Sequence, residues 1–303
     1  MRENKTLLAT LAALSTQIIF GFSFMFTKIA LRYASPMTVI ANRYMIAFLG
    51  LTLAAVLMRC KIKIDKNIWK PILMSVFQPV LYFVCETYGI QLTTTAFSSV
   101  IIALTPVVCI FPAMFVLREM PTPLQCIFTV VSIVGVAILS YAGKTGGVIT
   151  TAGVLYLCGA VVSGTIYIIM SRKLSDTYSA FERTYVMTVV GLVFFVALAL
   201  IEQRHTPLEI FAPFVNAPYV FSMLYLGVLS SVLAFLFLNY ANTYLTVAKT
   251  TVFLSVNMVV SVSAGVLLLK EPFTLIMLPA SIMVLVGVCG VQVCGGKNAK
   301  IRQ

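Results

Sequence analysis

Three charged side chains lie inside long apolar stretches of the sequence, namely Lys28, Arg43 and Glu86. In a bilayer, an unpaired charge costs about 2.5–3.5 kcal/mol on insertion scales. Residues of this kind bind ligands, gate a path or relay protons, or else they extend to the headgroup region. We take the three as candidate gating or coupling residues.

A second set of candidates is polar but uncharged. Gln78, Tyr82 and Glu86 follow one another at spacings of four, which places them on one helix face. Prolines in these stretches free backbone carbonyls, which must then face protein or a wet cavity. The sequence therefore predicts a substrate-binding set near mid-membrane, against the alternative of ordinary packing and interhelical hydrogen bonds. The set is Gln78, Tyr82, Thr105, Tyr167 and Asn257.

The sequence carries no signature of a membrane hydrolase or of direct ATP use. No Walker-type phosphate loop, HExxH or GxSxG pattern occurs in it. None of the seven cysteines forms a CxxC pair, and His205 is the single histidine. The sequence therefore predicts no catalytic residue, no metal site and no cofactor, and it indicates that the chain is not an enzyme.

The composition is that of an integral membrane protein. The 303 residues are 60% hydrophobic and 10% charged, against about 25% charged residues in ordinary soluble domains. Mean hydropathy is +1.03. These values exclude soluble, disordered and disulfide-rich secreted proteins. The net charge of +12 fits basic loops that orient membrane helices, and we expect no nucleic-acid partner.

Ten apolar stretches have the length of about 20 residues that crosses a bilayer. Ten crossings place both tails on one side, and 15 of the 21 lysines and arginines fall there. We therefore expect a multi-pass protein of the cell membrane with both termini in the cytoplasm. The first stretch is too long for a cleaved signal and is expected to be retained. The predicted helices cover about 7–31, 36–58, 69–91, 96–117, 122–142, 150–171, 182–201, 218–240, 246–269 and 273–294.

In this arrangement the three charges share one depth. Counted at 1.5 Å per residue from their helix ends, Lys28, Arg43 and Glu86 lie about 8, 10 and 8 Å below the outer face. Pairing lowers the cost of charges in the membrane. The sequence therefore predicts an ion pair of Glu86 with Arg43 or Lys28 that breaks when the outer side opens.

The two halves of the chain resemble each other at an offset of 152 residues. Five helices fall in residues 1–147 and five in residues 148–303. Because five is odd, the second half enters the membrane from the opposite side, and such inverted repeats are typical of secondary transporters. Matching positions include Tyr88 and Tyr240, Ala96 and Ala248, Gly135 and Gly287, and Leu117-Arg118-Glu119 and Leu269-Lys270-Glu271.

The earlier part of each half repeats more weakly, with Gly21 matching Gly164 after a small shift. The mirrored half predicts a second and weaker gate near the inner face. In that gate, Arg172 or Glu182 would contact Asn239.

Several short motifs occur in order within the two repeats. They are Phe20-Gly21-Phe22-Ser23-Phe24 followed by Lys28, Asn42-Arg43-Tyr44-Met45-Ile46-Ala47, Ala103-Leu104-Thr105-Pro106-Val107, Leu117-Arg118-Glu119 and Leu269-Lys270-Glu271-Pro272. With them the sequence resembles the EamA-like, ten-helix branch of the drug/metabolite transporter superfamily. It departs from that pattern at Phe20, which replaces a usual tryptophan, and at Met258, which stands opposite Pro106. The resemblance implies an all-α membrane protein of two inverted five-helix repeats, with helices 1–4 and 6–9 around a central site.

We therefore expect a secondary carrier that moves small, amino-acid-like metabolites by alternating access, in the export direction. The alternative within transport is a carrier of phosphorylated or nucleotide-linked sugars, which needs several deep basic groups. The alternatives of another class are a membrane-embedded enzyme and a receptor, neither of which needs the repeat. The expected partners are the small-molecule substrate and membrane lipid, and the sequence leaves a homodimer open.

Overall fold

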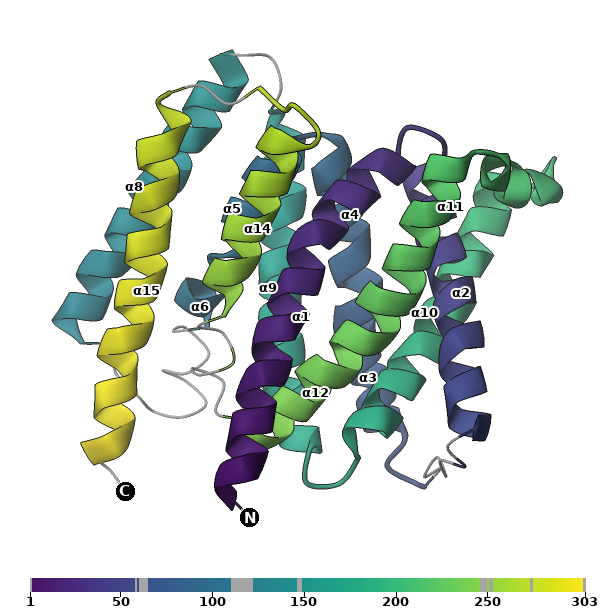
Figure 1. Ribbon diagram of the computed structural model, residues 1–303, viewed down its shortest axis with the longest axis horizontal. Coiled ribbons are helices and arrows are strands. Elements are labelled where there is room, and N and C mark those ends of the chain that lie inside the picture. The colour runs from purple at the N-terminus through teal and green to yellow at the C-terminus, as the bar shows by residue number, and fades with distance from the viewer. Residues whose placement is uncertain are drawn as a thin grey trace.

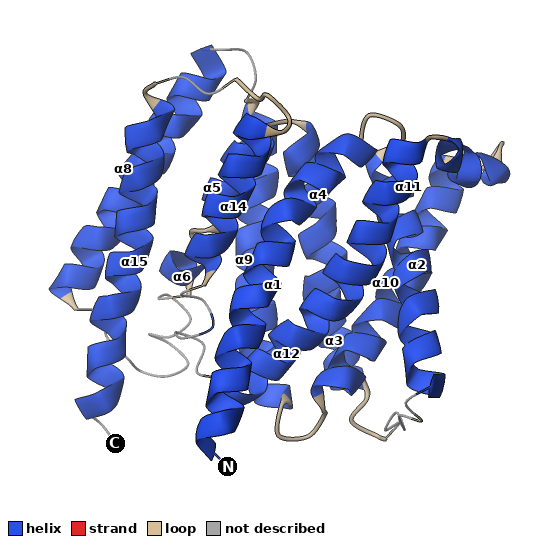
Figure 2. Ribbon diagram, viewed as in Figure 1, coloured by secondary structure: helices blue, strands red, loops and turns tan. Residues whose placement is uncertain are grey.

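The chain is built from helices joined by turns (Figure 2). The computed structural model describes residues 2–57, 59, 65–109, 122–145, 149–245, 250, 253–272 and 275–301. Within these ranges no β-strand occurs. The predicted all-helical class is therefore confirmed.

Within the described ranges, seven helical segments are long and apolar enough to cross a membrane. Each coincides with a predicted helix to within a few residues at either end. They are Lys5–Ala30, Pro36–Leu57, Trp69–Gln91, Pro123–Ala142, Thr151–Leu174, Ala180–Glu202 and Ala217–Tyr244.

Three shorter apolar helices fall where the other predicted helices lie. They are Thr95–Val108, Leu254–Leu267 and Met277–Val291. Parts of three predicted helices, 96–117, 246–269 and 273–294, lie outside the described ranges. Arg118 and Glu119 also lie outside them. The count of ten crossings stays a prediction.

The helices are named along the chain as in Figure 1. The first half contains α1 (Arg2–Ala30), α2 (Pro36–Leu57), α3 (Trp69–Ser75), η1 (Val76–Leu81), α4 (Tyr82–Gln91), α5 (Thr95–Ile102), α6 (Thr105–Val108) and α8 (Pro123–Thr145). The second half contains α9 (Thr151–Leu174), α10 (Ala180–Glu202), η2 (Pro207–Val215), α11 (Ala217–Leu224), η3 (Tyr225–Leu233), α12 (Ala234–Tyr244), α14 (Leu254–Leu267) and α15 (Met277–Ile301).

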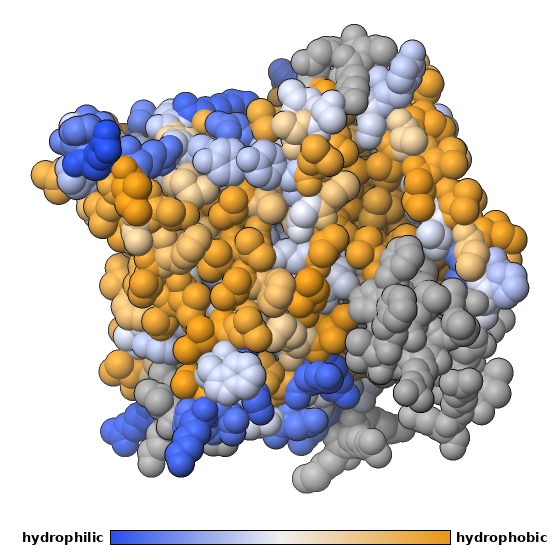
Figure 3. Space-filling model, turned by 180° about the vertical axis from the view of Figure 1, so that it is seen from behind, coloured by the Kyte–Doolittle hydropathy of each residue, from blue (hydrophilic) through white to orange (hydrophobic). Residues whose placement is uncertain are grey.

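The surface is apolar between two polar ends. The view from behind in Figure 3 shows a broad hydrophobic band with hydrophilic residues above and below it. Large hydrophobic side chains that are exposed on the surface of the protein include Leu49, Leu53, Val193 and Leu278. Because water would penalise so large a contiguous apolar area, the band indicates a lipid-facing wall.

The helices form two packing groups that each mix the two halves of the chain. In the first, which we call the α1 group, α1 packs on η3, α12 and α14, and α2 packs on η3. In the second, the α9 group, α9 packs on α3, η1, α4, α5 and α6, and α10 packs on α3 and η1. The two groups also pack directly on each other, chiefly through α2 on α10 and α5 on α14. Helices α8 and α15 pack mainly on each other, at one edge of the molecule (Figure 1).

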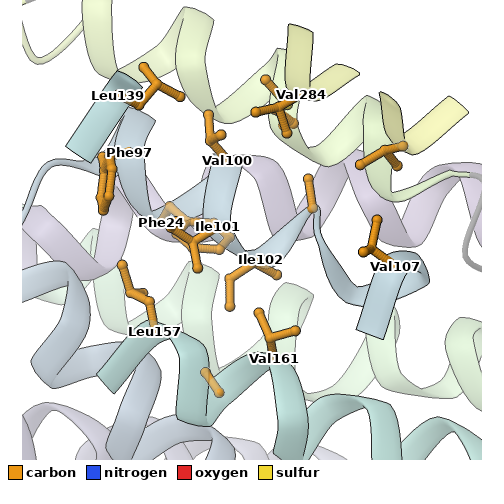
Figure 4. Packing of buried hydrophobic residues seen from close by; sticks show 14 of the residues in the cluster. Phe24, Phe97, Val100, Ile101, Ile102, Val107, Leu139, Leu157, Val161 and Val284 are labelled. Carbon is orange, nitrogen blue, oxygen red and sulfur yellow. The ribbon is translucent and has the colours of Figure 1, made fainter. Parts of the chain in front are cut away.

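Apolar packing joins the groups in the interior. Phe24 of α1 is 1% exposed and belongs to one buried cluster with Ile101 of α5 and Leu157 of α9. Figure 4 shows the Phe24 side chain beside Ile101. Burying an aromatic or aliphatic side chain contributes roughly 1.5–3 kcal/mol in water. In lipid, the same contacts act through close packing.

Two membrane segments are not continuous α-helices, since Trp69–Gln91 contains the π-helix η1 and Ala217–Tyr244 contains the π-helix η3. The segment Trp69–Gln91 is interrupted at Gln78, whose backbone is extended at φ −143° and ψ 115°, next to Pro79. At this interruption the Phe77 carbonyl accepts from the backbone N–H of Tyr82, and Ser163 Oγ of α9 also donates to it at 2.7 Å. The interruption lies where a proline removes a backbone donor from the helix.

Helices α1 and α14 approach so closely that a side chain on Gly21 would collide with α14. A Cβ atom there would lie 2.7 Å from Val260 Cβ and 3.0 Å from the carbonyl oxygen of Asn257. No neighbouring atom lies within 4 Å of such an atom on Gly50.

Replacing Gly21 by alanine is expected to destabilise the bundle by about 1–3 kcal/mol, because a backbone carbonyl cannot move aside. Thermal unfolding of the purified protein in detergent measures the effect. Gly50→Ala is the matched control, since it makes the same change without a collision. Equal unfolding temperatures for the two variants would contradict this contact.

Candidate functional site: a buried arginine and a buried carboxylate

Arg43 is held inside the bundle by two serines and an aromatic ring. It is 3% exposed. Its Nε donates to Ser231 Oγ at 2.6 Å, and its Nη2 donates to Ser230 Oγ at 2.9 Å. The guanidinium lies 4.0 Å from the centre of the Phe83 ring, a favourable cation–π distance. The contacts come from η3 and α4, so they fix the side chain between the two packing groups.

Glu86 is buried nearby, on α4, and 5% exposed. Its Oε1 accepts a hydrogen bond from the Tyr82 hydroxyl at 3.0 Å. The two residues are four apart on one helix face, as the sequence predicts. Arg43 and Glu86 interact electrostatically across the space between them.

The predicted ion pair of Glu86 with Arg43 or Lys28 is wrong for this structure. No such pair forms within 4.0 Å among these three residues, all of which the structure describes. The serine hydroxyls of η3 and the Tyr82 hydroxyl supply neutral partners. Both charges are therefore stabilised separately.

Each of the two buried charges retains an unused polar atom. Arginine has five N–H donors, and Arg43 uses two of them. Within the part of the chain that the structure describes, Arg43 Nη1 and Glu86 Oε2 have no hydrogen-bond partner, and neither atom is sealed from solvent. The bundle therefore holds one unused donor nitrogen and one unused carboxylate acceptor at these two positions.

Aromatic rings surround this pair. The Phe83 ring contacts Tyr44, Tyr82 and Phe235, with ring centres 5.2–6.1 Å apart. Phe235 in turn meets Tyr167 edge to face, at 6.3 Å. The structure therefore brings the predicted residues Tyr82 and Tyr167 into one aromatic cluster with Arg43.

The other predicted binding residues are buried but make different contacts. Asn257 Nδ2 donates to Gln17 Oε1 of α1 at 3.4 Å. The Thr105 hydroxyl bonds the Ile102 carbonyl on its own segment at 2.6 Å. Gln78 is 6% exposed and lies at the helix interruption. A single space shared by all five predicted residues stays a prediction.

Lys28 caps the end of a helix. Its Nζ donates to the carbonyls of Ile90 at 2.7 Å, Gln91 at 3.4 Å and Thr93 at 2.5 Å. A cation is favoured there because the last carbonyls of a helix are unpaired and carry partial negative charge.

Arg172 repeats this contact on α12. Its Nη1 donates to the carbonyl of Asn242 at 2.9 Å and also to the carbonyl of Thr243. Asn242 and Thr243 are the positions 152 residues after Ile90 and Gln91. The predicted repeat therefore relates two equivalent cation–carbonyl contacts.

Arg183 is a buried cation that the sequence analysis missed as such. It is 0% exposed, and all five of its donors are used. Nη1 bonds the carbonyl and the hydroxyl of Ser171, and Nη2 bonds the Asn239 carbonyl and the Thr243 hydroxyl, at 2.6–2.8 Å. Nε bonds the Ser179 carbonyl at 3.4 Å. A saturated arginine is a structural group, in contrast to Arg43.

The predicted contact of Arg172 or Glu182 with Asn239 requires correction. Asn239 Oδ1 instead accepts from the hydroxyls of Tyr167 at 3.0 Å and Ser171 at 2.7 Å. Glu182 completes a capping box with Ser179 at the start of α10. That Ser-x-x-Glu signal was available in the sequence and places Arg183 inside the helix.

Comparison with known proteins identifies the family. The sequence model of the EamA-like transporter family matches residues 7–141 and, a second time, residues 151–292. The chain belongs to this family. Since seven helices in the described part of the chain are able to cross a membrane, this EamA-like chain is a multi-pass membrane transporter, as the resemblance implied.

Curated relatives are similar over nearly their full length. The uncharacterized transporter YcxC of Bacillus subtilis is 30% identical over 298 residues, which cover 96% of this chain and 95% of the relative. An uncharacterized transporter of Archaeoglobus fulgidus is 25% identical, with 90% and 94% coverage. A solved structure described as "Crystal structure of protein" superposes with a TM-score of 0.64 at 15% identity, covering 94% of this chain and 98% of that one, and shows likeness of fold.

Removing Arg183 is expected to unfold the protein at lower temperature. Arg183→Met removes the charge-assisted hydrogen bonds to Ser171, Asn239 and Thr243, which contribute about 1.5–3 kcal/mol each. We expect a loss of about 3 kcal/mol or more, measured by thermal unfolding in detergent. Lys173→Met, at an exposed position, is the control and should leave stability unchanged. An unchanged unfolding temperature in Arg183→Met would show that these bonds contribute nothing.

Proposed function

We propose that this EamA-like protein is a secondary carrier that exports small, amino-acid-like metabolites by alternating access. The observation that carries the proposal is the buried pair of Arg43 and Glu86, which share no direct bond and each retain an unused polar atom. Burial of two unpaired opposite charges is costly in a membrane unless a ligand or ion completes them.

The chemistry of the pair fits an α-amino acid. The carboxylate of the ligand would accept from Arg43 Nη1, because a charge-assisted bond to a guanidinium is strong and directional. The ammonium group would donate to Glu86 Oε2. One carbon atom separates the two groups of the ligand, so the ligand can bridge side chains that do not touch each other. The rings of Tyr44, Tyr82 and Phe83 lie beside the pair and offer apolar surface to the ligand side chain.

The rival carrier of phosphorylated or nucleotide-linked sugars needs several free basic groups. Arg183 has no donor left, and Arg172 and Lys28 are bonded to helix carbonyls. Among these four described cations, Arg43 offers the free donors deepest in the bundle. A single guanidinium opposite a carboxylate suits a zwitterion better than a dianion.

The architecture we propose is ten crossings in two inverted repeats, residues 1–147 and 148–303, with both termini in the cytoplasm. Three observations support it. The family model matches twice, the Lys28 and Arg172 contacts are related by the repeat, and the N- and C-terminal ends lie at the same end of the molecule in Figure 1. A membrane enzyme or a receptor would not require this symmetry.

Counterflow into liposomes containing the purified protein tests the substrate. Labelled α-amino acids should exchange, while N-acetylated amino acids and the corresponding amines should not compete, because each lacks one charged group. Glu86→Gln and Arg43→Gln should each lower exchange about tenfold or more, the loss expected for one charge-assisted bond. The exposed carboxylate variant Glu209→Gln is the matched control.

Exchange of sugar phosphates in place of amino acids would support the rival carrier. Full amino-acid exchange in Glu86→Gln would show that Glu86 does not bind the substrate. Net efflux from cells that express the protein, compared with cells that express Glu86→Gln, tests the export direction.

A further inference from the structure

At one end of the bundle, two side chains of the α1 group bond the α9 group. Lys28 of α1 reaches the carbonyls at the end of α4. Glu271, which follows α14, accepts from the backbone N–H groups of Thr95 at 2.7 Å and Ala96 at 3.0 Å, at the start of α5. Thus a cation meets the negative end of one helix and an anion meets the positive end of the next. Both contacts cross the boundary between the packing groups.

At the opposite end, two side chains of the α9 group bond the α1 group. Arg172 of α9 reaches the last carbonyls of α12. Arg183 of α10 bonds the Asn239 carbonyl and the Thr243 hydroxyl, also on α12. These contacts cross the same boundary in the reverse sense, because here the cations belong to the α9 group.

The contacts at the two ends correspond through the repeat. The acceptors on α4 and α12 are 152 residues apart, and Lys28 and Arg172 are 144 apart, close to the shift of 143 that relates Gly21 and Gly164. Each cation lies in the last turn of the first membrane helix of its half and caps the third helix of the same half. Since the first helix of each half packs with the other half, each cap joins the two groups.

We propose that these contacts are two latches. The first is formed by Lys28 and Glu271 and the second by Arg172, and one latch opens in each half of the transport cycle while the other holds. The inference rests on the proposed carrier function and adds to it the residues that close each end. Both latches are formed in this structure.

Their chemistry suits a reversible contact. Lys28, Glu271 and Arg172 are only partly buried and bond backbone groups at helix ends. When a helix end moves away, water can replace these bonds on both sides, so opening leaves no unpaired charge in the membrane interior. The apolar residues behind each latch then become reachable.

Cysteine labelling in detergent tests the latches without any substrate. In a cysteine-free background, Ile101→Cys reports on the Lys28 end and Leu238→Cys on the Arg172 end. Both positions are buried, at 1% and 5% exposure. Ile101 lies about 9 Å along the helix from Thr95, and Leu238 lies about 6 Å from Asn242. The measurement is the rate of reaction with a hydrophilic maleimide.

Lys28→Met should raise labelling at position 101 about tenfold, the effect of losing about 1.4 kcal/mol of closure. Labelling at position 238 should not rise. Arg172→Met should do the reverse. The exposed neighbours supply matched controls, Lys270→Met for the first latch and Lys173→Met for the second, and neither should change labelling. Lys28→Arg, which keeps the donors, should label like the parent protein.

Labelling that rises at both positions in either variant, or at neither, would overturn the proposal and leave the contacts as ordinary helix caps. If Lys28→Met does not fold, Lys28→Gln gives the same comparison with one donor group kept. Failure of amino-acid exchange with end-specific labelling intact would reject the substrate and keep the latches. Normal exchange without end-specific labelling would do the opposite.

Discussion

Every backbone polar group inside a bilayer has to find its partner within the protein, and this constraint organises the bundle. Helix ends and interruptions are where such groups become free. In this chain the carbonyls of Phe77, Ile90 and Asn242 each accept a hydrogen bond from a side chain of a neighbouring helix, namely Ser163, Lys28 and Arg172. Bonds that satisfy the backbone therefore also join helices that are distant in sequence.

The same requirement explains how charges are distributed in the interior. Arg183 is saturated by carbonyls and hydroxyls and needs no counter-ion. Arg43 and Glu86 are each bonded only in part, by Ser230, Ser231 and Tyr82. The number of unused donors, more than burial itself, separates a structural arginine from one that can serve a ligand. Counting bonds therefore gives a physical basis for choosing residues to test.

The elements of the fold could be predicted from the sequence because hydropathy and length are strong signals in membrane proteins. The contacts between side chains on different helices were harder to predict than the helices themselves. Tyr82 and Glu86 are neighbours because a spacing of four is local information, whereas the separation of Glu86 from Arg43 depends on Ser230 and Ser231, nearly 190 residues away from Arg43. The burial of Arg183 could not be predicted, because a basic residue near the start of a membrane helix usually lies at the membrane–water interface.

The seam between α8 and α15 limits how the molecule can deform. A side chain on Gly287 would lie 2.7 Å from the Phe128 carbonyl, and one on Gly290 would lie 2.3 Å from the Phe128 ring. Surfaces fitted so closely do not slide past one another. Helix α8 ends the first half of the chain and α15 ends the second. The close packing of α8 on α15 therefore holds the two halves together along this line. Any large motion must therefore be a rearrangement within the remaining helices, in which the two halves in sequence are not the rigid bodies.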